Sequence, residues 1–231
     1  MKAPKYLLAS PLLVLVPQLH AQEQDSSSLF SMIQQGGWAM YPLAACSLVF
    51  IYIAIHCYRE TRPSRFAPAQ LLQQLTTHFA NANFDHAKQH AQASDTVLAR
   101  ALSIAFPKLD PTALNETREP FETEVGAALS AQENAISQWI HYLSVIANVA
   151  PMIGLLGTVS GMIGGFQTMS AGGMGRPELF AGDIGEALIT TATGLCIGIP
   201  AMIAHSYFNN RLNTAITNTT RQANTLTDHL N

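Results

Sequence analysis

Four threonines and one glutamate lie within or at the edge of long apolar stretches of this 231-residue chain. They are Thr158, Thr190, Thr191, Thr193 and Glu186, and their side chains can bind or relay protons. A threonine hydroxyl both donates and accepts hydrogen bonds, so a row of them can conduct water or relay a proton. The hydroxyl does not titrate near neutral pH, so the row cannot hold a proton. We therefore expect a deep titratable group to come from another chain if protons cross here. Glu186 is expected at the outer mouth of this proton pathway. The alternative is an interfacial acid at a helix start, where it complements the helix dipole.

Glycines surround these threonines at helical spacing. At about 100° per residue, small residues share one face of each of two helices: Gly154, Gly157, Gly161 and Gly165 in the first, and Gly194 and Gly198 in the second. Helix association in lipid depends on close packing, which glycine permits. We expect these stripes to be helix-packing surfaces that hold the chains of an assembly together. The alternative is a plain packing seam in which the Thr158 hydroxyl bonds to its own helix.

Three apolar stretches are long enough to cross a bilayer, at residues 38–58, 142–167 and 186–208. Only 12% of the residues are charged and 48% are hydrophobic, whereas about a quarter of a soluble domain is charged. The sequence therefore predicts an all-α integral membrane protein, with three transmembrane helices and long helical extensions into the cytoplasm.

The N-terminal residues predict which way the chain is inserted. Residues 1–21 have a basic start, a short apolar run and a small residue at the end, which is typical of a signal peptide. Cleavage would follow Ala21. The alternative is an N-terminal arm that is retained, because Leu19, at the third position before the cut, is larger than the alanine preferred there. Residues 22–37 would then be periplasmic. Arg59, Arg62 and Arg65 follow the first span, and by the positive-inside rule they predict a periplasmic N-terminus and a cytoplasmic C-terminus.

The remaining segments are expected to be helical or short. Residues 59–141 predict a cytoplasmic helical domain. Its apolar residues Leu71, Leu72, Leu75 and Phe79 fit helical spacing, and Pro107, Pro111 and Pro120 mark the join to a second helical pattern. Residues 168–185 predict a glycine-rich periplasmic loop. The tail, residues 209–231, predicts a cytoplasmic helix that continues the third span, which Pro200 can kink.

Other chemistry is weakly supported. His56, His141 and His205 fall near the cytoplasmic ends of the spans, but no carboxylate or cysteine accompanies them, so no metal site is predicted. Ser160 points away from the Thr158 stripe, and no catalytic residues or cofactor are expected, so the chain is not predicted to be an enzyme. A net charge of -3 without a basic face gives no sign of nucleic-acid binding.

Two motifs together resemble the paired signatures of the MotA/TolQ/ExbB proton-channel family, and of its ExbB members most. They are A-P-M-I-G-L-L-G-T-V-S-G-M-I-G-G-F at residues 150–166 and I-G-E-A-L-I-T-T-A-T-G-L-C-I-G-I-P-A at residues 184–201. By this resemblance Thr158 and Thr191 match pore threonines, and Glu186 matches the acid of the second motif. Three spans argue against a flagellar MotA subunit, which has four.

The resemblance implies a multi-pass subunit of a bacterial inner membrane. Such subunits form a homo-oligomeric ring, expected to be a pentamer, around an ExbD/TolR-like single-span subunit that supplies a membrane Asp. It also implies a TonB-like protein, and a function in which the proton gradient energises TonB-dependent transport across the outer membrane. Two alternatives stay open: a TolQ-like subunit for envelope maintenance, and a non-conducting membrane scaffold that clamps a partner helix.

Overall fold

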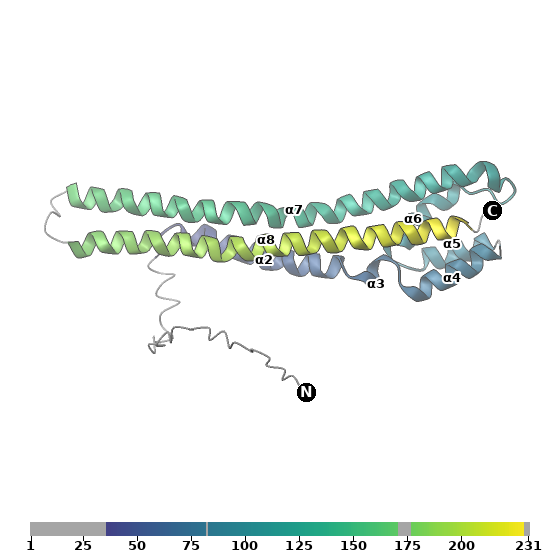
Figure 1. Ribbon diagram of the computed structural model, residues 1–231, viewed down its shortest axis with the longest axis horizontal. Helices are drawn as coiled ribbons and strands as arrows, with labels where there is room; N and C mark the ends of the chain where they lie inside the picture. Colours follow the sequence, from purple (N-terminus) through teal and green to yellow (C-terminus); the bar gives the residue numbers. More distant parts are fainter. Residues whose placement is uncertain (1–35, 82, 171–176, 229–231) are drawn as a thin grey trace, which may run out of the picture.

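Two long antiparallel helices form the frame of the molecule (Figure 1). The computed structural model describes residues 36–81, 83–170 and 177–228. Helix α7 (Leu114–Thr168) has 55 residues and α8 (Pro177–Thr227) has 51. At 1.5 Å per residue each helix is roughly 75–85 Å long, more than twice the hydrocarbon thickness of a bilayer. Each therefore has room for a membrane span and for a long extension beyond it.

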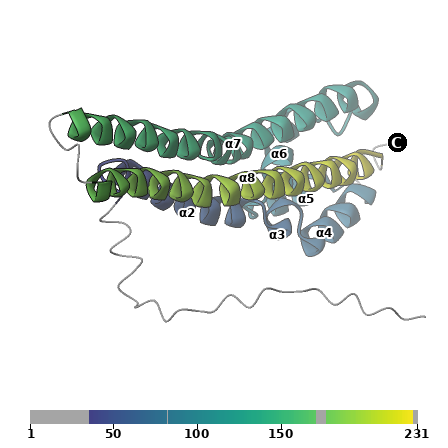
Figure 2. The ribbon, with the colours of Figure 1, turned by 60° about the vertical axis from the view of Figure 1, so that its left-hand side comes forward.

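A third long helix, α2 (Met40–Glu60), lies beside one half of the α7–α8 pair and contacts both helices (Figures 1 and 2). Three helices of the described chain are long and apolar enough to cross a membrane, and they are α2, α7 and α8. Many large apolar side chains on these helices are exposed, such as Tyr41 at 81% and Met152 at 68%. The described residues contain no strand, so the prediction of an all-α protein with three apolar helices is confirmed.

A small helical domain covers the other end of the pair (Figure 1). It contains α3 (Pro63–Phe66), α4 (Ala69–Ala80), α5 (Phe84–Gln92), α6 (Val97–Ala105) and the short 3₁₀ helix η1 (Phe106–Lys108). The predicted apolar face of α4 is confirmed, because Leu71, Leu75 and Phe79 are all buried.

Aromatic rings form the centre of this domain. The Phe79 ring centroid lies 5.8 Å from that of Phe84, 6.1 Å from that of Phe106 and 6.5 Å from that of Phe121. Phe121 belongs to α7, so the cluster attaches the small domain to the frame. Burying one such side chain stabilises a fold by about 1.5–3 kcal/mol.

Two helix boundaries differ from the predictions. Pro120 lies inside α7 and does not mark a join. Pro120 is the seventh residue of α7, and it leaves the carbonyl of Glu116 without a helical donor; Glu116 is exposed, so solvent can reach this part of the helix. Helix α8 begins at Pro177, so much of the predicted loop at residues 168–185 is helical; proline is favoured at the first position of a helix.

The C-terminal segment continues α8 as predicted, up to Thr227. Leu212, Ile216, Ala223 and Leu226 are buried along it, so this extension packs against the rest of the chain. The predicted signal peptide and residues 22–35 lie outside the described residues, as do residues 171–176 of the predicted loop.

Candidate functional site

The α7–α8 seam is built on glycine. A Cβ atom on Gly154 would lie 2.8 Å from the carbonyl oxygen of Thr190 and 3.0 Å from the Cα of Thr191. A Cβ on Gly194 would lie 2.6 Å from the carbonyl oxygen of Ala150. Real Cβ atoms essentially never come this close to backbone, so the two helices approach each other at a distance that only glycine allows.

The other glycines of the stripes extend the same seam. A Cβ on Gly161 would meet Ala187 Cβ and the Asp183 carbonyl oxygen, both at 3.0 Å, and one on Gly198 would lie 2.6 Å from Pro151 Cγ. Gly157 faces Thr190 and Ala39, and Gly165 is buried. We expected the stripes to join neighbouring chains. The structure corrects that expectation, because the stripes of α7 and α8 face each other within one chain.

Two threonines of α8 lie against the carbonyl oxygen of Gly154. The Thr191 hydroxyl donates to it at 3.1 Å. The Thr190 hydroxyl lies 3.3 Å from the same oxygen and 2.7 Å from the carbonyl oxygen of Ala187 in its own helix. Thr190 is 1% exposed, whereas Thr191 is half-buried. A hydrogen bond of this kind between membrane helices contributes about 0.6–2 kcal/mol.

The other two threonines are bonded within their own helices. The Thr158 hydroxyl donates to the carbonyl oxygen of Leu155 at 2.6 Å, and the Thr193 hydroxyl donates to that of Ile189 at 2.8 Å. Both side chains are half-buried. For Thr158 this is the bonding pattern of the plain packing seam, so its hydroxyl uses its proton locally and keeps acceptor capacity for another group.

Glu186 lies where the start of α2 meets the seam. The side chain contacts Gly37, whose φ is 60°, and a Cβ on Gly37 would overlap the Glu186 Oε1 atom. Beside it, the indole nitrogen of Trp38 donates to the Ser160 hydroxyl at 3.1 Å. Since α8 begins nine residues before Glu186, the alternative of a helix-start acid is wrong: the dipole effect falls off within the first turn.

The five predicted residues do not form one row. Glu186 and Thr190 lie on the side of the seam that α2 covers. Glu186 contacts Gly37, and the Thr190 side chain and Ala39 both lie against Gly157. Helical spacing places Thr193 toward that side and places Thr158 and Thr191 on the opposite side.

Sequence reasoning missed the role of the segment that leads into α2. Gly37 and Trp38 fix this segment on α7 and α8, and the Gly36-Gly37 pair ahead of an apolar stretch was the available signal. Among the predicted histidines, His56 packs against Trp139 with ring centroids 4.6 Å apart. Within the described residues, no three His, Cys, Asp or Glu side chains gather as a metal site would require.

Comparison with known proteins identifies the family. The family described as the MotA/TolQ/ExbB proton channel family matches residues 89–221, which is more than half of the chain. The chain belongs to the MotA/TolQ/ExbB proton channel family. With three helices apolar enough to cross a bilayer, it is thus a multi-pass membrane protein of a proton-channel family.

Several relatives within the MotA/TolQ/ExbB family are similar to this chain. A biopolymer transport protein ExbB of Xanthomonas campestris is 37% identical over 82 residues, which cover 36% of this chain and 32% of the relative. A Tol-Pal system protein TolQ of Haemophilus influenzae is 35% identical over 86 residues, which cover 37% of this chain and 38% of the relative. The biopolymer transport protein exbB1 of Vibrio cholerae is 29% identical over 196 residues, covering 76% of each chain. The match to the Xanthomonas relative thus spans about a third of its length.

Proposed function

We propose that this chain is the proton-channel subunit of an ExbB-ExbD-like motor that uses the proton gradient to energise TonB-dependent transport across the outer membrane. The observation that carries the proposal is the position of Thr158 and Thr191 on the side of the seam that α2 does not cover. Membership of a proton-channel family supports conduction, and the relatives that are named ExbB support this type of motor.

The side of the seam with Thr158 and Thr191 combines hydroxyls with exposed apolar side chains. By helical spacing Leu155 flanks Thr158 and Leu188 flanks Thr191, and these leucines are 60% and 63% exposed. Polar groups within a membrane usually face a bundle interior or a water-filled cavity. We propose that this surface faces the interior of the assembled ring.

The charge pattern supports a partner that carries the proton. The sequence has no Asp, Glu, Lys or Arg at residues 134–175 or 187–210, and threonine does not titrate near neutral pH. We propose an ExbD/TolR-like single-span subunit that supplies a membrane Asp, a homo-oligomeric ring, expected to be a pentamer, and a TonB-like protein that receives the work.

The proposed setting is a bacterial inner membrane. The spans are residues 38–58, 142–167 and 186–208, with the N-terminus periplasmic after a signal peptide and the C-terminus cytoplasmic. The arginines after the first span support this orientation by the positive-inside rule. In this arrangement Glu186 lies near the periplasmic mouth.

Two other functions have specific support. A TolQ-like role in envelope maintenance is supported by the relative from Haemophilus influenzae, whose identity is close to that of the ExbB relative from Xanthomonas. A non-conducting scaffold is supported by the local bond of Thr158 and by the glycine seam, since packing alone explains both.

Proton flux through the reconstituted complex tests conduction. The complex, with its co-purified partner, is placed in liposomes that contain a pH-sensitive dye. Thr158→Val and Thr191→Val should each lower the flux by about fivefold, which corresponds to one hydrogen bond of about 1 kcal/mol. Serine at either site should retain most of it, because the hydroxyl is kept.

Thr193→Val is the matched control for this measurement. It is the same substitution two residues from Thr191, at a hydroxyl that is bonded within its own helix and lies toward the other side. We expect wild-type flux. Equal losses in all three valine variants would contradict the assignment of the path, and wild-type flux in all three would favour the scaffold. Mass spectrometry of the co-purified subunit separates an ExbD-like partner from a TolR-like one.

A further inference from the structure

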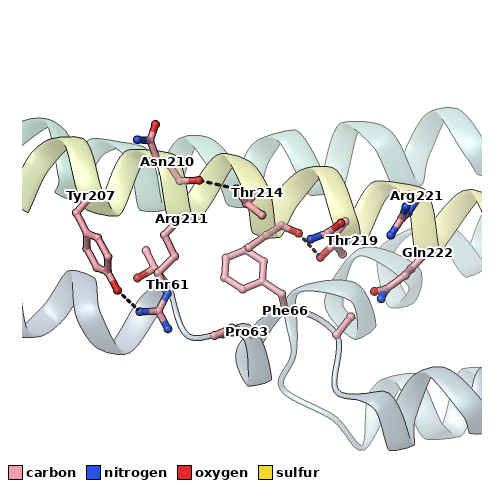
Figure 3. A pocket seen from close by; sticks show the side chains of 13 residues that line it. Thr61, Pro63, Phe66, Tyr207, Asn210, Arg211, Thr214, Thr219, Arg221 and Gln222 are labelled. Atoms are coloured by element: carbon pink, nitrogen blue, oxygen red, sulfur yellow. Dashed lines mark hydrogen bonds between the residues drawn. The ribbon is translucent and has the colours of Figure 1, made fainter. Parts of the chain in front are cut away.

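A groove of about 640 Å³ lies between the end of α2, the short helix α3 and α8 (Figure 3). Both of its long walls are at the end of an apolar stretch. Thr61 directly follows α2, and Arg211 is the first charged residue of α8 after Glu186. The groove therefore lies at the level where the hydrocarbon of a membrane gives way to headgroups.

Three arginines at the groove lack an acidic partner in the part of the chain that the structure describes: Arg211 and Arg221 line it, and Arg62 stands between its lining residues Thr61 and Pro63. The Arg211 guanidinium lies 5.7 Å from the ring centroid of Tyr58, and its Nη1 atom donates to the Tyr207 hydroxyl at 3.0 Å. The Arg62 guanidinium lies 5.1 Å from the same Tyr58 ring.

The nearest acid in the sequence is already paired. Glu60 follows Tyr58 by two residues, and its carboxylate pairs with Arg65 at 3.0 Å. Among the described residues, no carboxylate lies within ion-pair distance of Arg62 or Arg211. Two unneutralised cations over one ring repel each other, so an anion placed between them would be stabilised.

An apolar surface leads along α8 to the groove. Ile199, Ile203, Tyr207 and Arg211 recur every four residues, so they share one face of the helix. The two isoleucines are 57% and 65% exposed. On α2, exposed Ile51 and Ile55 lead to Tyr58 in the same way. The order is apolar, then aromatic, then cationic, which is the order of acyl chain, interface and phosphate in a lipid leaflet.

We propose that the groove binds the headgroup of an anionic phospholipid, with the phosphate on Arg211 and Arg62 and the acyl chains along the isoleucines. The planar guanidinium matches two phosphate oxygens at once. Basic pockets at the ends of membrane helices are suited to anionic headgroups. A free phosphate ion would make no use of the apolar face, so the combined surface fits a lipid.

Native mass spectrometry of the full-length complex in mild detergent tests the proposal. Phosphatidylglycerol or zwitterionic phosphatidylethanolamine is added, and the bound molecules per chain are counted. Wild-type protein should retain phosphatidylglycerol in preference. Arg211→Gln should lower its occupancy by about fivefold, the effect of one arginine near an anionic headgroup. Arg211→Lys keeps the charge without the planar fork and should give an intermediate loss.

Arg59→Gln is the matched control. Arg59 is exposed at the same end of α2 and does not line the groove. Its substitution therefore removes one positive charge at the same level of the membrane without changing the groove. It should keep the wild-type preference. Equal losses in Arg59→Gln and Arg211→Gln would overturn the proposal in favour of diffuse attraction. An equal occupancy of both lipids in wild-type protein would overturn it, as would displacement of phosphatidylglycerol by inorganic phosphate. A changed ring mass in Arg211→Gln with unchanged lipid would show a subunit interface instead.

Discussion

At the scale of single residues, the contact between Gly37 and Glu186 fixes the start of α2. Gly37 has a φ of 60°, a conformation that residues with a Cβ rarely adopt, and a side chain there would also overlap the Glu186 carboxylate. Both the backbone and the neighbour therefore require glycine.

Gly37→Ala should lower the thermal stability of the detergent-solubilised protein. Backbone strain of this kind costs about 1–3 kcal/mol, and the displaced carboxylate adds to it. Gly126→Ala is the control, because that glycine lies in a helix where an added Cβ would meet no described atom within 4 Å; alanine there should stabilise α7 by up to about 1 kcal/mol. A Gly37→Ala melting temperature at or above that of wild type would contradict the described contact.

Glu186→Gln should separate charge from shape at the same place. The amide fills the same space against Gly37, so thermal stability should stay close to that of wild type. If the carboxylate gathers protons at the periplasmic mouth, although it lies on the other side of the seam from Thr158 and Thr191, proton flux in liposomes should fall in part. Full flux in this variant would leave Glu186 with a packing role alone.

At the scale of elements, the seam between α7 and α8 depends on backbone contact and carries two threonine hydroxyls against the Gly154 carbonyl. Its glycines leave no room for a side chain. A substitution that widens the seam also moves Thr191 away from its acceptor, so packing and hydrogen bonding fail together.

Gly154→Ala should destabilise the chain by about 1–3 kcal/mol through overpacking. The new Cβ would lie 2.8 Å from a backbone oxygen that cannot move aside as a side chain would. Gly164→Ala, in the same helix but with none of the described atoms within 4 Å of the new Cβ, should cost nothing. Thermal unfolding followed by circular dichroism measures both. Because the contact is within one chain, the loss should appear even in a preparation without the partner subunit.

Sequence reasoning predicted the seam but not what lies against it. Helical spacing shows that Gly154, Gly157 and Gly161 share a face, and this holds whether the neighbour is another chain or α8. The start of α8 was missed because Gly182 and Gly185 are typical of loops. The helix nevertheless begins at Pro177, since proline is favoured at the first helical position, and it includes both glycines. The pairing of Gly37 with Glu186 joins residues far apart in the chain, and no local pattern indicates it.

At the scale of the whole molecule, α2 and the small helical domain lie at different parts of one long pair of helices, α7 and α8 (Figure 1). The small domain, with its buried phenylalanines, lies at the end of the pair where the arginines follow α2. The proposed orientation places this whole end in the cytoplasm.

Reporter fusions test that orientation. An alkaline phosphatase that is active only outside the cytoplasm should be active when fused after Ser170, at the end of α7, and inactive after Ser94 or Thr227. The physical reason is the cluster of Arg59, Arg62 and Arg65 after the first span, which favours the cytoplasmic side. A fluorescent protein that matures only in the cytoplasm gives the opposite readout at the same sites. Activity after Ser94 would reverse the orientation.

Two prolines, one in the interior of each long helix, fall at nearly the same height. Pro151 of α7 packs against Gly198 of α8, and Pro200 follows two residues later. Each proline removes one rung from the hydrogen-bond ladder of its helix. Figure 2 shows α7 bending part-way along its length. Because both helices are weakened at the same level, the pair should bend there first. A sideways force on one end of the pair would then change the angle between its two halves at Pro151 and Pro200, and the helical segments on either side would stay straight.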